Sequence, residues 1–169
     1  MQNKEFQPCR SNQPFQFIIL NMNQLRLPPF DHKLKKEGGK NLILDLIRKK
    51  YVVLTPEEWV RQHFVHFLIS QMKYPKSLFK IESGLKFNKI QKRSDILIYN
   101  RQGKSWMVVE CKSPDIKLTQ KAFNQIAVYN MTIGAKYLAV TNGLVHYCCE
   151  ASKALDEATF LSDFPEFEG

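Results

Sequence analysis

Apolar and polar residues follow two different periods along the chain, and the change of period predicts where helices and strands lie. Thr55 and Pro56 form a typical helix start, with an N-cap hydroxyl, a proline at the first helical position and two acids in the first turn. Beyond them, apolar residues recur at helical spacing. We therefore expect a helix that runs to about Met72 and is ended by Pro75.

Downstream of this helix the period falls to two, which is typical of β-strands. Residues 78–87 are expected to form a strand with a break at Gly84. Residues 95–99 and 105–112 are expected to form two further strands. The polar, glycine-bearing segment NRQGK between them predicts a hairpin.

The second half of the chain repeats this succession of a helix and strands. A helix is predicted over residues 120–131, with Thr119 as its N-cap and Gly134 near its end. Two short strands follow at 135–140 and 144–149, and the turn signal TNG joins them. The predicted order is helix, three strands, helix, two strands, so the fold class is α/β.

The amino-terminal part of the chain is less clearly patterned. Residues 1–21 show no periodicity and are predicted to be a loosely ordered extension, or a leader upstream of a start at Met22. Residues 31–50 combine a basic run with an apolar stretch that fits a strand or a short helix. Because 169 residues suit one hydrophobic core, residues 22–169 are expected to form a single domain.

Composition and charge narrow the classes of protein. A hydrophobic content of 44% excludes a disordered chain, and no apolar run approaches the roughly 18 to 20 residues of a membrane span, so a cytoplasmic protein is expected. The net charge of +9 is unevenly spread, because residues 150–169 hold six acids and one lysine while residues 1–149 carry +14. This asymmetry favours a polyanionic partner, although charge serves solubility equally well.

Candidate chemistry gathers where Glu110 and Lys112 end the apolar strand MVVECKSP. If residues 102–103 form a two-residue turn, Asp95 directly faces Glu110, whereas a four-residue loop over 100–103 shifts the pairing by two. In either register the carboxylates are neighbours, and two full charges about 5 Å apart repel by about 3 kcal/mol at an effective dielectric near 20. We therefore expect a cation between them, and Lys112 is one candidate because residues i and i+2 of a strand share a face.

A salt-bridged triad without chemistry is the purely structural interpretation of these three residues. Three features favour chemistry. The Glu-x-Lys pair ends an apolar strand, a further acid faces it across the hairpin, and Gln125 and Tyr129 project from one face of the following helix.

Taken together, the segments LTPEEWVRQ, KRSDILIYNRQGK, VVECKSPDIKLTQ, FNQIAVYNM and YLAVTNGLVHYCC resemble the PD-(D/E)xK nucleases. More narrowly, they resemble the amino-terminal nuclease domain of type I restriction enzyme R (HsdR) subunits, over about residues 22–168. The resemblance implies a restriction-endonuclease-like core with a mixed central sheet flanked by helices. It also implies a Mg²⁺-dependent DNA endonuclease, with Mn²⁺ as a substitute. The alternative is a catalytically silent module that keeps the fold and binds nucleic acid or a partner.

The resemblance also implies roles for individual residues. Asp95 and Glu110 match the metal-binding carboxylates, and the backbone carbonyl of Cys111 completes the protein ligands. Ser94 replaces the proline that names the motif, and Lys112 matches the catalytic lysine. Two carboxylates and a carbonyl leave room for water and phosphate among the roughly six oxygen ligands that Mg²⁺ prefers.

Further positions complete the implied site. Gln125 and Tyr129 match residues that the exonuclease-like branch places over the site, and Glu57, with Glu58 beside it, matches an acid on the first helix. A basic segment flanks these positions and is expected to follow the phosphate backbone. The candidate nucleic-acid contacts are Lys89, Lys92, Arg93, Arg101 and Lys104.

The expected partners follow from the same resemblance. DNA is the substrate, and because the sequence contains no Walker signature, restriction-system subunits or a separate motor protein are expected alongside it. One site cuts one strand, so a double-strand break requires either two sites, which a homodimer would supply, or two passes of one site.

Overall fold

A computed structural model of the chain describes residues 24–87, 90–151 and 158–168. The expected extension at residues 1–21 lies outside the described residues. The first described elements form a small antiparallel sheet of three strands, β1 (Leu34–Glu37), β2 (Lys40–Asp45) and β3 (Lys50–Val53). The stretch whose type the sequence left open is therefore built of strands.

The first helix, α2 (Pro56–Ser70), begins where the sequence predicts and ends two residues before Met72. The Thr55 hydroxyl accepts a hydrogen bond from the backbone N–H of Glu58 at 3.0 Å, which satisfies one of the amide groups that a helix start leaves unpaired. A 3₁₀ turn, η1 (Lys76–Leu78), follows directly after Pro75. The second helix, α3 (Gln120–Ile133), ends at Gly134, whose φ of 65° favours glycine.

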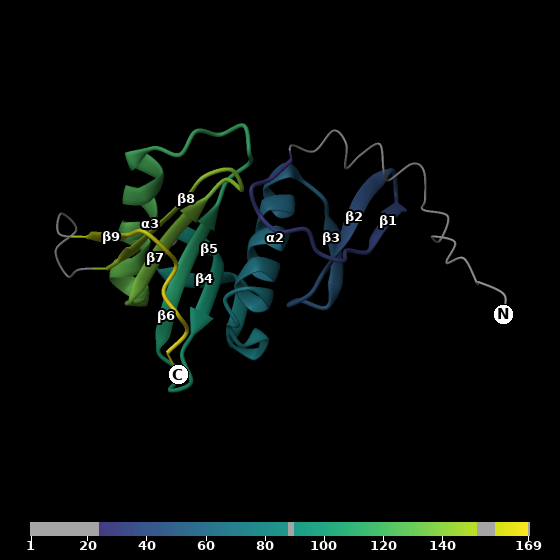
Figure 1. Ribbon diagram of the computed structural model, residues 1–169. Helices are drawn as coiled ribbons and strands as arrows, with labels where there is room; N and C mark the ends of the chain where they lie inside the picture. Colours follow the sequence, from purple (N-terminus) through teal and green to yellow (C-terminus); the bar gives the residue numbers. More distant parts are fainter. Residues whose placement is uncertain (1–23, 88–89, 152–157, 169) are drawn as a thin grey trace, which may run out of the picture.

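A mixed sheet of six strands forms the centre of the molecule (Figure 1). Its order follows the chain, with β6 and β7 parallel and every other neighbouring pair antiparallel. Its strands are β4 (Phe79–Phe87), β5 (Ile90–Tyr99), β6 (Ser105–Cys111), β7 (Tyr137–Thr141), β8 (His146–Glu150) and β9 (Thr159–Leu161). The chain is therefore a mixed α/β protein, and the predicted order of helix, three strands, helix and two strands is observed from α2 to β8.

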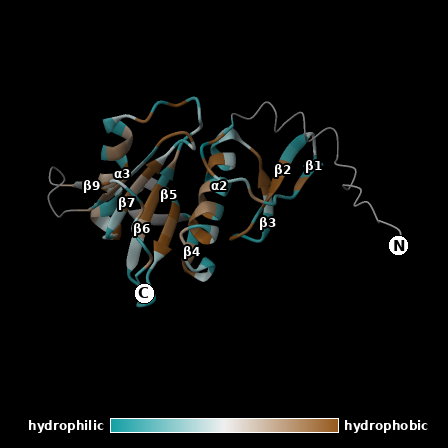
Figure 2. Cartoon of the chain, viewed as in Figure 1, coloured by the Kyte–Doolittle hydropathy of each residue, from teal (hydrophilic) through white to brown (hydrophobic). Residues whose placement is uncertain are grey.

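The two helices cover opposite faces of this sheet. Figure 1 shows α2 between the two sheets, and α3 on the far face of the larger one. Ile96, Met107 and Cys111 belong to the core cluster that contains α2 residues, whereas Leu97 and Val108 pack with α3 residues. Residues 96–98 of β5 and 106–109 of β6 are hydrophobic and buried, and Figure 2 shows brown segments in these strands. No helix among the described residues is long and apolar enough to cross a membrane.

The β5–β6 hairpin adopts the register that places Asp95 opposite Glu110, although it lacks a two-residue turn. The loop holds five residues, 100–104, and the side chain of Asn100 accepts hydrogen bonds from the backbone of Gln102 and Lys104. An irregularity between Ile98 and Tyr99 then shifts the pairing by one residue. The bulge offsets the extra length of the loop, so that Asp95 still lies opposite Glu110.

Two expectations for the sheet are wrong. Gly84 does not break β4, because it pairs regularly with Arg93 of β5. The irregularity lies at Glu82, whose φ of 51° is unusual for a residue with a side chain and interrupts the pairing between Ile81 and Ser83. The sequence analysis also missed β9, because a three-residue strand carries too little periodicity to detect.

The two threonine caps provide a matched test of helix capping. Thr55 makes its capping hydrogen bond, whereas the Thr119 side chain makes none to α3. Thr55→Ala should therefore lower the free energy of unfolding by about 1 kcal/mol, and Thr119→Ala by clearly less. Urea denaturation of both variants measures the difference, and equal losses would contradict the assignment of the caps.

Candidate active site

Asp95 and Glu110 lie side by side on two inner strands of the larger sheet, near the point where β6 ends. Ile96 pairs with Val109, so one step further along the ladder Asp95 lies opposite Glu110. The backbone N–H of Cys111 donates a hydrogen bond to Asp95 Oδ2 at 2.6 Å, which fixes this carboxylate against the end of β6. Both carboxylate side chains are largely buried. The two predicted acids are therefore brought together.

Arg61 of α2 binds the Asp95 carboxylate directly. Its Nη2 lies 2.7 Å from Asp95 Oδ1, and its Nη1 donates a short hydrogen bond to Glu58 Oε2. Burial alone would lower the pKa of Arg61, but the carboxylates of Asp95 and Glu58 raise it above its ordinary value. Arg61 thus remains a buried cation that ties α2 to β5.

A second arginine extends this network to the small sheet. Arg48, in the β2–β3 turn, contacts Asp45 at 2.7 Å, Glu58 at 2.8 Å and Glu82 at 2.9 Å. Buried Glu58 thus binds both arginines, and it also accepts a hydrogen bond from Gln62 Nε2. The network joins the small sheet, α2 and the irregular position in β4.

Lys112 is the cation that pairs with Glu110, at 2.5 Å between Nζ and Oε1. The pKa of Glu110 is nevertheless raised, first by burial and then by the Asp95 charge, and Lys112 opposes this shift only in part. The pKa of Lys112 is raised despite burial, because Glu110, Asp95 and Glu57 favour its charged form. Each strand carboxylate therefore has its own cation, Arg61 for Asp95 and Lys112 for Glu110.

Glu57 and Glu58, adjacent in sequence, take different positions. Glu58 is buried and bound by arginines, whereas the side chain of Glu57 is 45% exposed and lies 3.6 Å from Arg61. The pKa of Glu57 is raised by burial and by the charge of Asp95. The charge of Asp95 therefore acts on Glu57, which stands at the start of α2.

Gln125 and Tyr129 lie on α3, which packs against β5, β6 and β7. Gln125 is exposed, and Tyr129 packs at the margin of the α3 core cluster. Strand alternation places Glu110 on the α3 side with Val108, and Cys111 on the α2 side. The Cys111 side chain belongs to the core.

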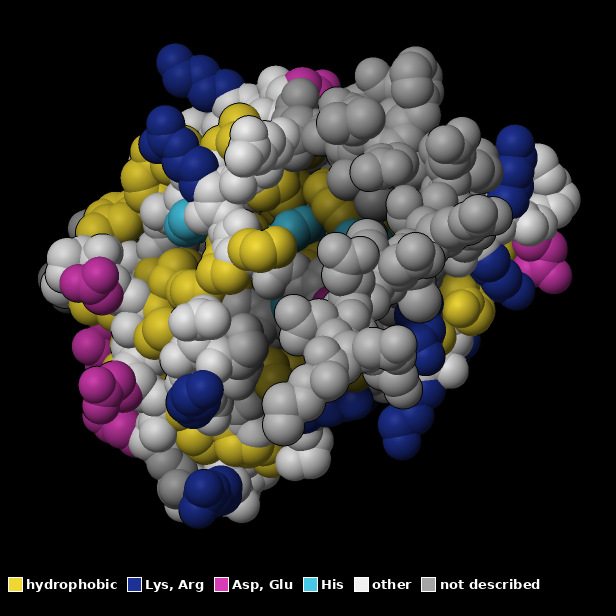
Figure 3. Space-filling model, turned by 45° about the vertical axis from the view of Figure 1, so that its right-hand side comes forward, with side chains coloured by type: hydrophobic (Ala, Val, Ile, Leu, Met, Phe, Trp, Pro, Cys, Tyr) yellow, Lys and Arg dark blue, Asp and Glu magenta, His cyan; other side chains and the backbone are white. Residues whose placement is uncertain are grey.

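The predicted basic contacts occupy different places. Lys92 and Arg93 lie in β5, three and two residues before Asp95, where they pair with Leu85 and Gly84. Arg101 and Lys104 are exposed in the hairpin loop, at the opposite end of β5 and β6 from the carboxylates. Lys89 lies outside the described residues. On the face shown in Figure 3, the coloured Lys and Arg side chains stand apart, with neutral and hydrophobic surface between them.

The ion pairs around the site leave an excess of negative charge. Within the part of the chain that the structure describes, no three His, Cys, Asp or Glu side chains come close enough together to hold a metal ion. The ion pairs themselves join six carboxylates to three cations, namely Asp45, Glu57, Glu58, Glu82, Asp95 and Glu110 to Arg48, Arg61 and Lys112. Among the described side chains, these ion pairs therefore hold three more acids than cations, and two of the acids, Glu57 and Glu82, are 45% and 42% exposed.

Comparison with known families identifies the chain. A family model described as the type I restriction enzyme R protein N terminus (HSDR_N) matches residues 56–165, from the first residue of α2 to a point beyond β9. The chain belongs to the HSDR_N family. The matched segment includes Asp95, Glu110 and Lys112.

One solved structure is similar to this HSDR_N chain. It is a fragment assigned to the HsdR subunit of a type I restriction enzyme from Vibrio vulnificus YJ016, with 26% sequence identity and a TM-score of 0.38. The alignment covers 53% of this chain and 19% of that chain. No curated protein matches the chain.

The sequence analysis missed Arg61 as the partner of Asp95. Arg61 follows Glu57 by four residues and Glu58 by three, a spacing that predicts ion pairs on one helix face. The contact with Asp95 depends on how α2 packs against the sheet. The spacing of residues within one helix does not predict that packing. In the HSDR_N chain this arginine supplies a cation for Asp95, whereas the sequence analysis named Lys112 as one candidate.

Removing the Arg61 charge should destabilise the fold strongly. Arg61→Met leaves Glu58 and Asp95 without their buried cation, and loss of one partner of a buried pair costs about 3–5 kcal/mol. Urea denaturation measures this loss, with Arg101→Met in the exposed hairpin loop as the control, expected within about 0.5 kcal/mol of wild type. Adding Asp95→Asn to Arg61→Met should restore part of the stability. Similar losses for the two arginine variants would contradict the role of Arg61.

The raised pKa of Glu110 predicts a pH-dependent stability. Above this pKa the native state holds a buried charge that burial and Asp95 disfavour, so Glu110→Gln should raise the melting temperature at pH 7 without divalent metal. The gain should shrink as the pH falls through the raised pKa, toward the ordinary value of 4.5, because wild-type Glu110 then becomes neutral as well. Exposed Glu150→Gln serves as the control. If the gain in melting temperature of Glu110→Gln instead grew toward low pH, the raised pKa of Glu110 would be contradicted.

Proposed function

We propose that this HSDR_N chain is a Mg²⁺-dependent nuclease that hydrolyses phosphodiester bonds of DNA. The observation that carries the proposal is the pair of buried carboxylates, Asp95 and Glu110, brought together from neighbouring strands with Lys112 beside them. This arrangement fits the PD-(D/E)xK pattern on which the resemblance rests. Membership of the HSDR_N family supports a restriction-system context with DNA as substrate.

The residues present fit a hard divalent cation. Mg²⁺ is usually bound through one or two carboxylates together with water and substrate phosphate, so the site does not need three carboxylate ligands. Asp95 and Glu110 would hold the ion, with the Cys111 carbonyl and exposed Glu57 as further oxygen donors. The raised pKa of Glu110 supports this assignment, because it reflects first burial and then repulsion from Asp95, and a bound cation would favour the charged form against both. When bound, Mg²⁺ lowers the pKa of water and offsets charge that develops on the phosphate.

The chain's own residues prepare the site in different ways. Arg61 and the Cys111 N–H hold Asp95 in one orientation, since each binds a different carboxylate oxygen. Lys112 keeps its positive charge, as its raised pKa indicates, and would neutralise the phosphate or orient the attacking water. Gln125 and Tyr129 would contact the DNA from α3.

The basic residues suggest how DNA would approach. Lys92 and Arg93 precede Asp95 in β5 and are the predicted contacts closest to it in the strand. Phosphate contacts of this kind give affinity without sequence preference and weaken with salt. We place restriction-system subunits, a separate motor protein or a second copy of the chain among the partners on the strength of the resemblance alone.

One observation favours the alternative of a silent binding module. Asp95 Oδ1 accepts a hydrogen bond from Arg61, and an ion pair of this kind competes with a metal for the same carboxylate. Were Arg61 to hold Asp95 permanently, the chain would bind nucleic acid without cutting it. A metal titration distinguishes the two functions.

Cleavage assays test the nuclease proposal directly. Supercoiled and linear DNA incubated with Mg²⁺ or Mn²⁺ should be cut by the wild-type chain, and Lys112→Ala, Asp95→Ala or Glu110→Ala should reduce the rate by at least about a hundredfold. Lys50→Ala, an exposed lysine of β3, is the matched control and should cut at the wild-type rate. Undiminished cleavage in all three site variants would refute the assignment.

Thermal shift with Mg²⁺ or Mn²⁺ separates the active nuclease from the silent module. Binding to the native state raises the melting temperature in proportion to the logarithm of free metal over the dissociation constant. We expect a concentration-dependent rise for the wild type that Asp95→Ala abolishes. DNA binding with a steep salt dependence, but with neither a metal response nor products, would instead support the silent module.

A further inference from the structure

A cavity lies beside the carboxylates in the same row across the sheet. Val140 of β7 pairs with Glu110 of β6, and Tyr147 of β8 pairs with Val140. Neighbouring strands lie about 4.8 Å apart, so the side chains of Glu110, Val140 and Tyr147 succeed one another over about 10 Å. Val140 and Tyr147 line a cavity of about 190 Å³. The cavity therefore begins one strand away from Glu110.

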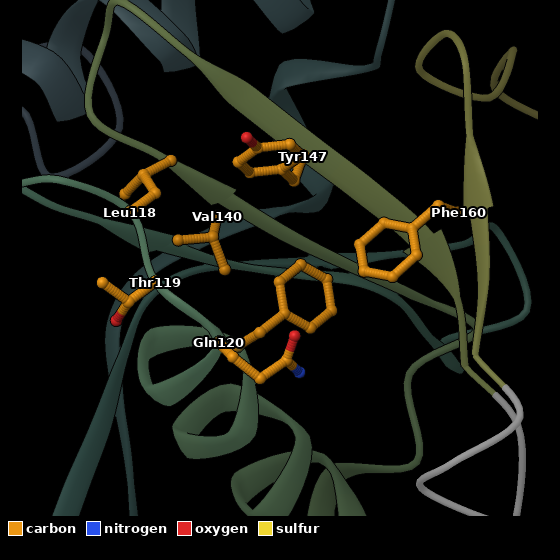
Figure 4. Close-up of a pocket in the computed structure, with 7 residues that line it drawn as sticks. Leu118, Thr119, Gln120, Val140, Tyr147 and Phe160 are labelled. Atoms are coloured by element: carbon orange, nitrogen blue, oxygen red, sulfur yellow. The ribbon is translucent and has the colours of Figure 1, made fainter.

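The walls of this cavity combine flat rings with two polar side chains (Figure 4). Phe160 of β9 and Phe123 of α3 have ring centroids 5.0 Å apart, and Tyr147 stands on the neighbouring strand β8. Facing the strands are residues at the start of α3. The full lining is Leu118, Thr119, Gln120, Phe123, Val140, Tyr147 and Phe160. A volume below the 300–1,000 Å³ typical of drug-sized ligands limits the occupant to one small ring system.

The polar groups of the cavity suit the edge of a nucleobase. Thr119 occupies the N-cap position of α3, yet its hydroxyl makes no capping hydrogen bond to the helix. The Gln120 amide donates to Asn124 Oδ1 at 3.0 Å, and its carbonyl oxygen is an additional acceptor. Rings that stack and amide or hydroxyl groups that bond a base edge are the usual means by which proteins bind unpaired bases.

The loop that leads into α3 carries Leu118 and Thr119 of the cavity lining. This loop is basic and is held in place by a hydrogen bond. Lys112 and Lys117 lie between β6 and α3, Lys121 lies in the first turn of α3, and Asp115 is the one acid of residues 112–121. Buried Asn142 donates a hydrogen bond from Nδ2 to the carbonyl of Ile116 at 2.9 Å, which attaches the loop to the β7–β8 turn. Lys117 and Lys121, which directly precede and follow the lining residues 118–120 in the chain, complement a phosphate backbone that runs past the cavity.

We propose that this cavity binds an unpaired nucleobase of the DNA strand whose phosphate lies at the Asp95 and Glu110 site. The substrate is then single-stranded or locally opened DNA, because a base in an intact duplex cannot reach such a cavity. This inference rests on the proposed function for the position of the strand. The base itself is recognised by the rings and by Thr119 and Gln120, which belong to no part of the nuclease site.

Strand binding without cleavage tests the inference. Fluorescence anisotropy in EDTA compares a twelve-nucleotide oligothymidylate with an abasic oligomer of the same length, using the full chain. The wild type should bind the base-bearing strand more tightly, and Tyr147→Ala should weaken that binding between about fivefold and a hundredfold. Binding of the abasic strand should not change. Tyr147→Phe keeps the ring and should keep the preference for bases.

Matched variants control for effects on the fold. Tyr147 is 46% exposed and Phe160 is 55% exposed, so truncation of either leaves little buried surface unpaired, and Phe160→Ala is the second variant if the first unfolds. Val128→Ala, also 46% exposed but on α3 outside the cavity, should bind both strands as the wild type does. Circular dichroism melting verifies that each variant is folded.

The possible outcomes separate this inference from the nuclease proposal. Wild-type protein that binds both strands equally, or binds neither, overturns the inference, as does a Tyr147→Ala variant with unchanged preference. If Mg²⁺-dependent cleavage is nevertheless observed, the nuclease proposal survives alone. If Tyr147-dependent base binding is found without cleavage under any metal, the cavity assignment stands and the nuclease proposal fails.

Discussion

The buried ion pair between Arg61 and Asp95 determines how the rest of the site is built. Two carboxylates on neighbouring strands repel, and a largely buried pair cannot stay ionised without compensation. Arg61 supplies that compensation from α2, and in doing so fixes the first helix against β5. Lys112 compensates Glu110 from the same strand. Because the two carboxylates use different cations, the space between them does not have to be filled by a side chain.

The ion pairs that continue from Arg61 connect the small sheet to the site. Glu58 lies between Arg61 and Arg48, and Arg48 in turn reaches Asp45 of β2 and Glu82 of β4. Chains of buried polar groups are stable only when each member has a partner. The position of α2, and through it the orientation of Asp95, therefore depends on residues far from the carboxylates in sequence. Glu57 contacts this network through Arg61 at 3.6 Å, and its side chain is 45% exposed.

The sequence was most informative where a local signal determines the structure. Thr55 and Pro56 define the start of α2, Gly134 defines the end of α3, and the alternation along β5 and β6 identifies the central hairpin. The loop length predicted the strand register only in part. The observed pairing of Asp95 with Glu110 also depends on a bulge at Tyr99, which the sequence does not indicate. The irregularity at Glu82, the strands of residues 34–53 and the partner of Asp95 depend on tertiary contacts. Patterns within one segment do not contain that information.

Strand register also connects the Asp95 and Glu110 pair to the neighbouring cavity. Shifting a strand by one residue transfers every side chain to the opposite face of a sheet. The bulge in the β5–β6 hairpin sets Glu110 against Asp95, and the parallel pairing of β6 with β7 sets Val140 against Glu110. The tight turn between β7 and β8 then sets Tyr147 against Val140. The carboxylate pair and the aromatic cavity thus lie on one row across the sheet because the registers of three successive strand pairs place them there.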